Sequence, residues 1–379
     1  MYATPQNALH RMNNPLAARG ALRSATKQWG LPSRDFPVGE LLLRSVFDDV
    51  DVDLSVFLGT GASGPGGTYT GTMRATGQPV AVKFMCAHDL AAELKTHTEI
   101  ALHRACHDHP NIATLVAAYA AEHNAHALAC KHNRPPPPPP GFTALPPKAK
   151  VRFTVLVTAR AAGGDLFERV ARGPALGAAQ EQRVAAQVAA AVAHAHRLGI
   201  MLGDLKLENC VIVPAAGAAG AAGAAGAAGA AGAALFDVQL IDFGFARAAP
   251  SAEPVCTPAF AAPEVVHAAT QGGTFYLPAD MWAVGTLLFM LHEKTLPFTT
   301  AAAAALGAKL TLGNMPADMR ERIFAGTHSS RDRLVAQLLR PQPHDRLTAA
   351  ALLAAVAAGA EGEGEGASPP PHAHGSLFF

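Results

Sequence analysis

The sequence lacks several features that would point to particular classes of protein. No apolar run approaches the about 18 residues that a membrane-spanning helix needs, and even Met281–Leu291 is too short. The formal net charge of +1 gives no electrostatic reason to expect a nucleic acid or an anionic membrane as a partner. The five cysteines are scattered and form no Cys-x-x-Cys pair, and no secretory signal is apparent. We therefore expect an intracellular, soluble protein with free thiols that binds neither nucleic acid nor membrane.

The two ends of the chain differ in composition from its middle. With 379 residues, of which 50% are hydrophobic, the chain is long enough for two lobes with separate cores. Residues 1–51 are basic at first, with no acidic residue before Asp35, and we expect a disordered leader there; an organelle transit peptide is the alternative. Residues 358–379 alternate Glu with Gly and then contain consecutive prolines, which predicts a disordered tail. These features favour the cytoplasm as the location, with organelle import as the alternative reading.

One short stretch near the middle carries a dense set of chemical groups. Residues 202–209 read Leu-Gly-Asp-Leu-Lys-Leu-Glu-Asn, and Asp242-Phe243-Gly244 follows after a run of Ala-Ala-Gly repeats. Phosphoryl transfer needs a carboxylate that accepts the proton of a hydroxyl and an ammonium that offsets charge on the phosphoryl group. It also needs an amide oxygen and a second carboxylate that hold a metal ion. Asp204, Lys206, Asn209 and Asp242 provide these groups.

A glycine-rich segment with strand-like flanks precedes this stretch. Gly59, Gly61 and Gly64 follow the apolar residues 56–58, and a Val-Ala-Val-Lys strand then ends at Lys83. Residues without a Cβ atom allow backbone N–H groups to approach phosphate oxygens closely. Such a glycine pattern is a weak signal by itself, and the lysine at the end of the next strand strengthens it considerably.

In this order, the motifs resemble those of eukaryotic serine/threonine protein kinases. The segments Gly163–Phe167 and Thr257–Glu264 fit the same pattern. The motifs are most similar to those of the calcium/calmodulin-dependent kinase-like group. The resemblance covers residues 52–357 and implies an α+β, two-lobed protein-kinase-like fold. A small antiparallel β-sheet lobe with one main helix would span residues 52–159, and a larger, mainly α-helical lobe residues 160–357. Insertions would lie at about 131–150 and 214–234.

The resemblance also implies an activity and a role for each motif residue. The chain is expected to transfer the γ-phosphoryl group of ATP to serine or threonine hydroxyls of protein substrates, with Mg²⁺ as cofactor. The catalytic residues would be Asp204 and Lys206, and the metal ligands Asn209 and Asp242. The residues that bind ATP would be Gly59, Gly61, Gly64, Ala81, Lys83, Glu99, Ala159, Ala161 and Val211. Thr257, Glu264 and Arg346 would shape the activation segment and the substrate site. Glu99, rather than Glu93, is expected to pair with Lys83.

Three departures from the family pattern leave an alternative open. Leu-Gly stands where the family has His-Arg before Asp204, the glycine loop is about two residues longer, and Cys256 replaces a glycine. The alternative is an inactive or weakly active pseudokinase that acts as a nucleotide-binding scaffold. Because Gly203 cannot bind a phosphate, we expect basal activity without phosphorylation of the activation segment, in which Ser251 would be exposed. The run Pro135–Pro140 predicts a spacer, or else a ligand for an SH3- or WW-type module.

Overall fold

A computed structural model describes most of the central part of the chain. The described residues are 41–42, 45–59, 66–87, 90–124, 150–215, 235–251, 257–266, 273–274, 276–297 and 329–362. They divide into two compact units. The smaller unit contains the described residues up to Asp108, then Thr114–Arg160 and Phe243–Pro250; the larger unit contains His109–Ala113, Ala161–Asp242 and the described residues from Ser251 onward.

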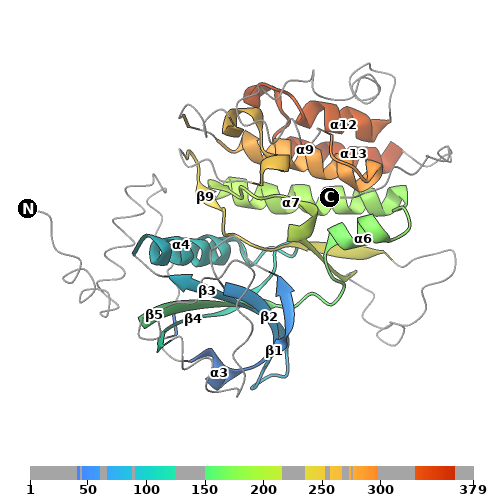
Figure 1. Ribbon diagram of the computed structural model, residues 1–379. Coiled ribbons are helices and arrows are strands. Elements are labelled where there is room, and N and C mark those ends of the chain that lie inside the picture. The colour runs from blue at the N-terminus through green and yellow to red at the C-terminus, as the bar shows by residue number, and fades with distance from the viewer. Residues whose placement is uncertain are drawn as a thin grey trace, which may run out of the picture. The chain divides into compact units, whose positions relative to one another are not determined.

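The smaller unit is built on a five-stranded antiparallel sheet with the strand order β1-β2-β3-β5-β4. The strands are β1 (Val50–Gly59), β2 (Gly66–Met73), β3 (Pro79–Ala87), β4 (Leu115–Asn124) and β5 (Lys150–Ala159). Helix α4 (Leu90–Cys106) packs against β3 and β5, as Figure 1 shows. Gly77, with φ of 70°, makes the turn between β2 and β3. The structure therefore contains the small antiparallel sheet and the main helix that the sequence predicts.

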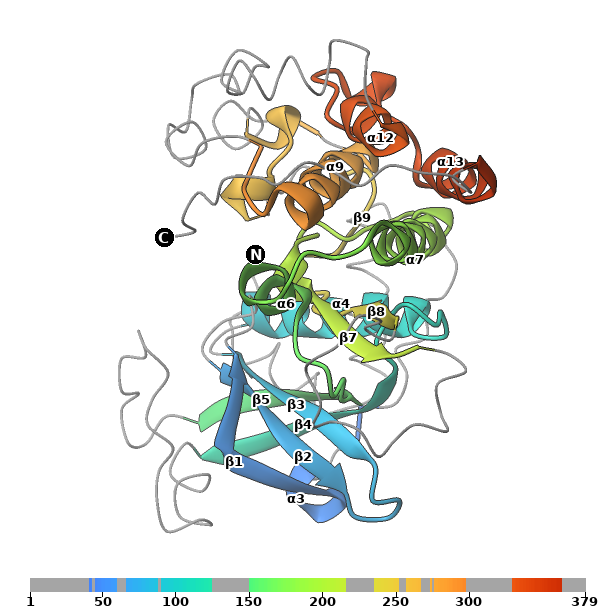
Figure 2. The same cartoon turned by 90° about the vertical axis from the view of Figure 1, so that its right-hand side faces the viewer.

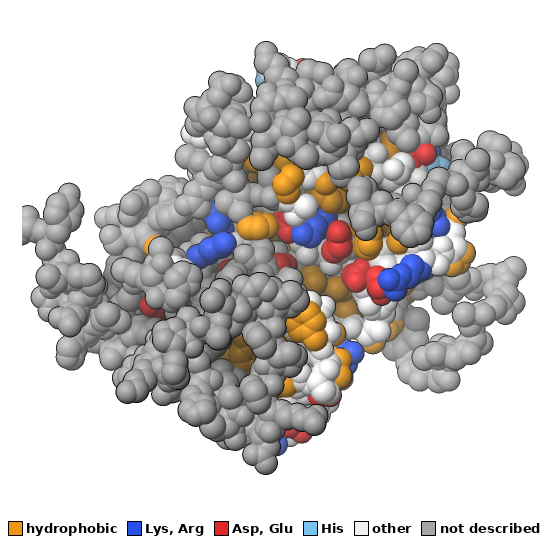
Figure 3. Space-filling view, in the orientation of Figure 1, with side chains coloured by type: hydrophobic (Ala, Val, Ile, Leu, Met, Phe, Trp, Pro, Cys, Tyr) orange, Lys and Arg blue, Asp and Glu red, His pale blue; other side chains and the backbone are white. Residues whose placement is uncertain are grey.

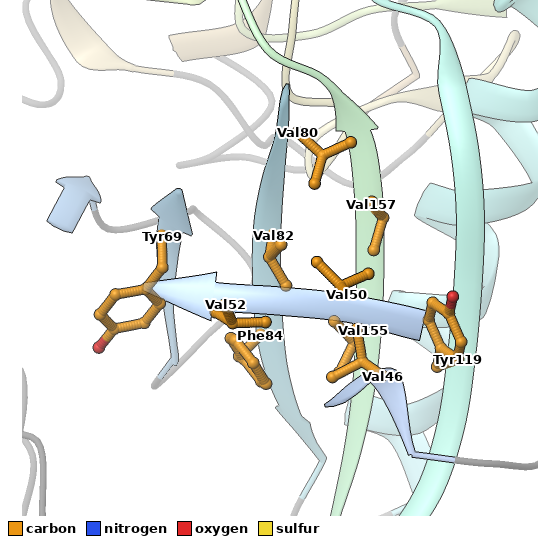
Figure 4. Packing of buried hydrophobic residues seen from close by; sticks show 10 residues of the cluster. All are labelled: Val46, Val50, Val52, Tyr69, Val80, Val82, Phe84, Tyr119, Val155 and Val157. Atoms are coloured by element: carbon orange, nitrogen blue, oxygen red, sulfur yellow. The ribbon is translucent and has the colours of Figure 1, made fainter. Parts of the chain in front are cut away.

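The core of this sheet includes residues that lie before the predicted start of the domain. Figure 4 shows ten buried side chains, contributed by the strands and by the short helix α3 (Val46–Asp49). Val46 and Val50 are 2% and 0% exposed. Leu42 also bonds to β4, since its N–H donates to the carbonyl of Ala118 at 2.9 Å. The disordered leader expected over residues 1–51 is therefore wrong for the described residues from 41 onward, because their apolar side chains are part of the core; residues 1–40 lie outside the described part.

The larger unit is mainly helical. Its helices are α6 (Leu166–Arg172), α7 (Ala178–Arg197), α9 (Pro278–Glu293), α12 (Ser330–Leu338) and α13 (Ala349–Gly362), with short 3₁₀ helices at Leu207–Asn209, Pro258–Phe260 and Pro343–Asp345. Helix α13 packs on α7 and α12 packs on α9 (Figure 2). The predicted valine stripe of α7 is fully buried at Val184, Val188 and Val192. Because α13 continues to Gly362, the folded chain extends past the predicted boundary at residue 357.

Four short strands complete the described structure around the residues of interest. In the larger unit, β6 (Ile200–Met201) precedes the loop that carries Asp204, and β7 (Cys210–Pro214) pairs antiparallel with β8 (Phe236–Leu240). In the smaller unit, β9 (Arg247–Ala248) follows the Asp-Phe-Gly triplet. The register of the β7–β8 ribbon pairs Cys210 with Leu240 and Pro214 with Phe236.

The boundary between the units is less simple than the predicted division at residue 160. Residues His109–Ala113 belong to the larger unit, where the N–H of Ala113 donates to the carbonyl of Leu240 at 2.9 Å. Residues Phe243–Pro250 belong to the smaller unit, where the ring of Phe243 stacks on His103 of α4 at 4.5 Å between centroids. These contacts join residues more than 100 positions apart, so a reading of the sequence in order assigned both segments to the wrong lobe.

Some predicted features fall on residues that the structure does not describe. These are Gly61, Gly64, the run Pro135–Pro140, Cys256, and most of the two insertions. No helix within the described ranges is long and apolar enough to cross a membrane. Among the coloured atoms of Figure 3, acidic and basic side chains lie next to each other, as a net charge near zero would suggest.

Candidate functional site

A buried ion pair joins the central strand and the main helix of the smaller unit. Lys83 lies on β3, and its Nζ is 2.6 Å from Oε1 of Glu99 on α4. The side chains are 11% and 1% exposed, so water screens this pair little. Glu99 is thus a partner of Lys83, as the sequence predicts. The pair holds an ammonium group at a fixed place, as the binding of phosphate oxygens requires.

The other predicted ATP-binding residues are distributed over both units. In the smaller unit, Gly59 ends β1 with φ of 154°, and Ala81 on β3 is paired in register with Thr158 of β5, next to Ala159. In the larger unit, Val211 lies on β7, and Ala161 follows the end of β5 and is half-buried. The binding of one ATP molecule by residues of both units is therefore a prediction from the resemblance.

Helix α9 fixes the backbone that leads to Asp204. The carboxylate of Asp280, 2% exposed, accepts hydrogen bonds from the N–H groups of Leu202 at 2.8 Å and Gly203 at 2.9 Å. It also lies 3.0 Å from Nε2 of His196, near the end of α7. Gly203 has φ of 77°, a left-handed conformation that glycine adopts without strain. The sequence motifs gave no role to Asp280 or His196; the one available signal was a carboxylate at the start of a largely apolar helix.

The carboxylate of Asp204 is the centre of a compact hydrogen-bonded group. Its Oδ1 accepts hydrogen bonds from the backbone N–H and from the hydroxyl of Thr257. Its Oδ2 lies 2.8 Å from Nζ of Lys206 and accepts from Nδ2 of Asn209 at 2.9 Å. Nζ of Lys206 also donates to the Thr257 hydroxyl at 2.9 Å. The site therefore accommodates a hydroxyl group between a carboxylate and an ammonium group.

Asn209 and Asp242 lie at the same end of the β7–β8 ribbon. Asn209 directly precedes β7 and Asp242 follows β8, and the N–H of Ile241 donates to the carbonyl of Asn209 at 2.9 Å. Nδ2 of Asn209 is bonded to Asp204, which leaves the amide oxygen as its ligand atom. Hard oxygen donors of this kind suit Mg²⁺, which typically takes one or two protein groups and completes its shell with phosphate and water. The described residues hold no cluster of three His, Cys, Asp or Glu that would suit a more fully protein-bound metal.

A second buried ion pair anchors the segment after Thr257. Arg346 donates from two nitrogens to the two carboxylate oxygens of Glu264, at 2.6 and 2.7 Å. Its guanidinium group also lies over the ring of Trp282, 5.1 Å from the centroid. The predicted pairing of Arg346 with Glu264 is thus present. Ser251, however, is buried rather than exposed, so the expectation that it is open to modification is wrong; the alanine, proline and glutamate residues around it in the sequence gave no sign of this burial.

The cysteine beside the loop has no sign of reactivity. Cys210 is fully buried, and burial, together with the nearby Glu208 carboxylate, raises the pKa of its thiol to about 12. Its Sγ donates to the carbonyl of Lys206 at 3.4 Å. Because a thiol with this pKa stays protonated at neutral pH, Cys210 packs the loop and takes no part in nucleophilic chemistry.

Comparison with known proteins identifies the family. The model of the protein kinase domain family matches residues 53–356. MAP kinase-activated protein kinase 5 of Mus musculus and of Homo sapiens are each 24% identical over 336 residues, or 82% of this chain and 60% of theirs. CBL-interacting protein kinase 19 of Oryza sativa subsp. japonica is 27% identical over 363 residues, or 92% of this chain and 55% of that protein. The chain thus spans a little over half the length of these relatives, and it belongs to the protein kinase domain family.

Proposed function

We propose that the chain is a protein serine/threonine kinase that transfers the γ-phosphoryl group of ATP to hydroxyls of protein substrates. The observation that carries the proposal is the hydroxyl of Thr257, which donates to the Asp204 carboxylate while Lys206 donates to its oxygen. A substrate hydroxyl needs this environment at the moment of transfer, so the site has the required groups at the required separation. Family membership and relatives that are themselves protein kinases support the same conclusion.

Asp204 and Lys206 would act on the two reacting partners. Asp204 orients the substrate hydroxyl and accepts its proton as the new oxygen–phosphorus bond forms. The bond between the γ-phosphorus and the β–γ bridging oxygen breaks, and ADP leaves with that electron pair. Lys206 stays protonated and offsets negative charge on the transferred group. Atoms and charges balance, and no further reactant is needed.

Lys83 would hold the α- and β-phosphates of ATP, with Glu99 keeping its ammonium group in place. Gly59, Gly61 and Gly64 would cover the phosphates, while Ala81, Ala159, Ala161 and Val211 would contact the adenine end. Asn209 and Asp242 would hold Mg²⁺, which supplies positive charge to the phosphate oxygens when bound. Thr257, Glu264 and Arg346 would shape the site for the peptide around the acceptor hydroxyl.

The proposed kinase domain corresponds to the predicted residues 52–357, extended by the folded residues before and after them. We place the protein in the cytoplasm, in agreement with its free buried thiols Cys106 and Cys210. Protein substrates are its principal partners. The run Pro135–Pro140 suits a partner with an SH3- or WW-type module, since polyproline II segments are the ligands of such modules.

The observations favour an enzyme over the scaffold alternative. The replacement of His-Arg by Leu202-Gly203 removes none of the groups that the chemistry needs. The backbone of both residues is bonded to Asp280, and Asp204, Lys206 and Asn209 remain in mutual contact. The loop is thus ordered without a basic side chain at residue 203.

The test is incubation of the protein with γ-labelled ATP, Mg²⁺ and generic basic protein substrates, followed by phosphoamino acid analysis. We expect label in phosphoserine or phosphothreonine. Asp204→Asn should lower the rate by about 10²–10⁴-fold, as loss of a general base does. Glu208→Gln is the matched control, because Glu208 is exposed in the same loop and should keep the parental rate. No transfer by the parent, or equal transfer by Asp204→Asn, would contradict the proposal.

A further inference from the structure

We infer that three side-chain amides act as a substitute strand that positions Asp242, the proposed Mg²⁺ ligand. These amides belong to Asn111, Gln180 and Gln187, and we call them the amide edge. The inference rests on the proposed function, because it assigns positioning residues to the same metal site.

Strand β8 has an open edge that other groups complete. Within the described residues, β8 pairs with β7 on one edge and makes a single parallel bridge, between Leu240 and Ile112, on the other. The remaining backbone groups on that second edge need other partners. On that edge, the N–H of Phe236 donates to Oε1 of Gln180 at 3.0 Å. The N–H of Val238 donates to Oε1 of Gln187 at 2.9 Å. The N–H of Leu240 donates to the backbone carbonyl of Asn111 at 2.8 Å.

The carbonyl groups of the same three residues are also satisfied. The carbonyl of Phe236 accepts from Nε2 of Gln180 at 3.0 Å, and that of Val238 accepts from Nδ2 of Asn111 at 2.9 Å. The carbonyl of Leu240 accepts from the N–H of Ala113 at 2.9 Å. Every outward backbone group at Phe236, Val238 and Leu240 therefore has a partner, as it would beside a third strand.

An ion pair sets the orientation of the central amide. Nε of Arg183 donates to Oδ1 of Asp237 at 2.6 Å, and Nε2 of Gln187 donates to the same oxygen. With its nitrogen turned to Asp237, the Gln187 amide presents its oxygen to the N–H of Val238. Gln180, Arg183 and Gln187 are spaced three and four residues apart, so they lie on one face of α7.

The far end of β8 leads directly to the metal site. After Leu240, Ile241 donates its N–H to the carbonyl of Asn209, and Asp242 follows with φ of 64°. A left-handed conformation at a residue other than glycine persists only where the surrounding structure imposes it. The ribbon partner β7 holds one side of β8, and the amide edge, together with the backbone of Asn111 and Ala113, holds the other. Loss of the amide edge should therefore let β8 and Asp242 move away from Asn209.

The test compares Gln187→Ala with Gln182→Ala in the full-length chain. Gln182 is a matched control, because it is the same residue type on α7, is half-buried, and donates instead to the carbonyl of Val356 in α13 at 3.3 Å. Two quantities are measured for the parent and both variants. One is amide hydrogen exchange over Phe236–Leu240, and the other is the Mg²⁺ concentration that gives half-maximal thermal stabilisation in saturating ADP.

Gln187→Ala should speed exchange at Val238 and raise the half-maximal Mg²⁺ concentration about tenfold, the lower end of the effect of removing a partner behind a metal ligand. Gln182→Ala should lower the melting temperature without changing either quantity. An unchanged Mg²⁺ midpoint in Gln187→Ala would overturn the inference, even if the melting temperature falls. If Gln187→Ala does not fold, Gln180→Ala carries the same test, with a smaller rise because Phe236 lies farther from Asp242. If the parent shows no Mg²⁺-dependent stabilisation in ADP, the proposed function fails, and the inference fails with it.

Discussion

The two units hold their charged groups in place by different means. In the smaller unit, Lys83 lies on β3, which has hydrogen-bonded neighbours on both sides, β2 and β5. Its neighbours Val82 and Phe84 belong to the apolar core of Figure 4. In the larger unit, Asp204 lies on a loop that pairs with no strand among the described residues, and polar side chains, notably that of Asp280, hold the loop backbone. In a regular sheet, backbone groups form hydrogen bonds with each other, whereas in a loop they need side chains as hydrogen-bond partners. Distant polar substitutions should therefore disturb the Asp204 loop far more than they disturb Lys83.

Among the variants that test how each unit holds its charged groups, the largest effect should come from removing the charge at Lys83. Lys83→Met should lower kcat/KM for ATP by about 10²-fold, the effect of a misplaced phosphate group. It should also destabilise the fold, because Glu99 is then buried without its cationic partner.

The double variant Lys83→Met/Glu99→Leu separates the two effects. Replacement of both charges by apolar groups should restore most of the melting temperature, since the sheet and core remain, but none of the activity. Activity that returns together with stability would show that Lys83 serves only the fold. The measurements are thermal melts and steady-state kinetics of the parent, Lys83→Met and the double variant.

A smaller effect is expected for Asp280→Asn, which breaks the polar support of the loop. The variant keeps the shape of the side chain but loses a charge that accepts two backbone hydrogen bonds, which should lower the free energy of unfolding by about 2 kcal/mol. The transfer rate should fall about tenfold, because a loop that is less firmly held places Asp204 less well.

Asp165→Asn is the control for that substitution. Asp165 caps α6 by accepting from the N–H of Glu168 at 2.8 Å, and asparagine caps helices about as well as aspartate. The stability and activity of the Asp165→Asn variant should match those of the parent. Equal behaviour of the two variants in chemical denaturation and kinetics would refute the special role of Asp280.

The smallest effect concerns the thiol groups. Each unit contains one buried cysteine whose thiol has a raised pKa. Burial raises the pKa of Cys106 in the smaller unit to about 12, as it does for Cys210 in the larger one. The thiols of Cys106 and Cys210 should therefore stay unmodified after a short exposure of the native protein to iodoacetamide at pH 8. In urea, both thiols should react fully. Rapid native labelling of either would contradict their burial. Because the unfolded thiols ionise near pH 9 and the folded ones do not, these groups should lower the free energy of unfolding as pH rises from 9 to about 12.

The sequence predicted best those features that depend on neighbours in the chain. The valine stripe of α7 and the groups of the Asp204 loop follow from local spacing, and the Lys83–Glu99 pairing follows from the order of motifs. The sequence could not reveal the support from Asp280, 76 positions after Asp204, or from the amide edge, because such contacts depend on how distant segments meet. The prediction of a disordered leader failed before residue 52 for a different reason. The basic composition of residues 1–34 was extended to the whole segment, although apolar residues such as Val46 follow it.

The most direct test of the account measures ATP affinity and transfer rate side by side in Lys83→Met and Asp204→Asn. In the proposed mechanism, Lys83 acts on the nucleotide and Asp204 acts on the acceptor hydroxyl. We therefore expect Asp204→Asn to bind ATP with nearly the parental affinity while losing about 10²–10⁴-fold in rate. Lys83→Met should have a lower kcat/KM for ATP, by about 10²-fold. Parental rates in Asp204→Asn, or an unchanged kcat/KM for ATP in Lys83→Met, would contradict the assignment of these groups to phosphoryl transfer.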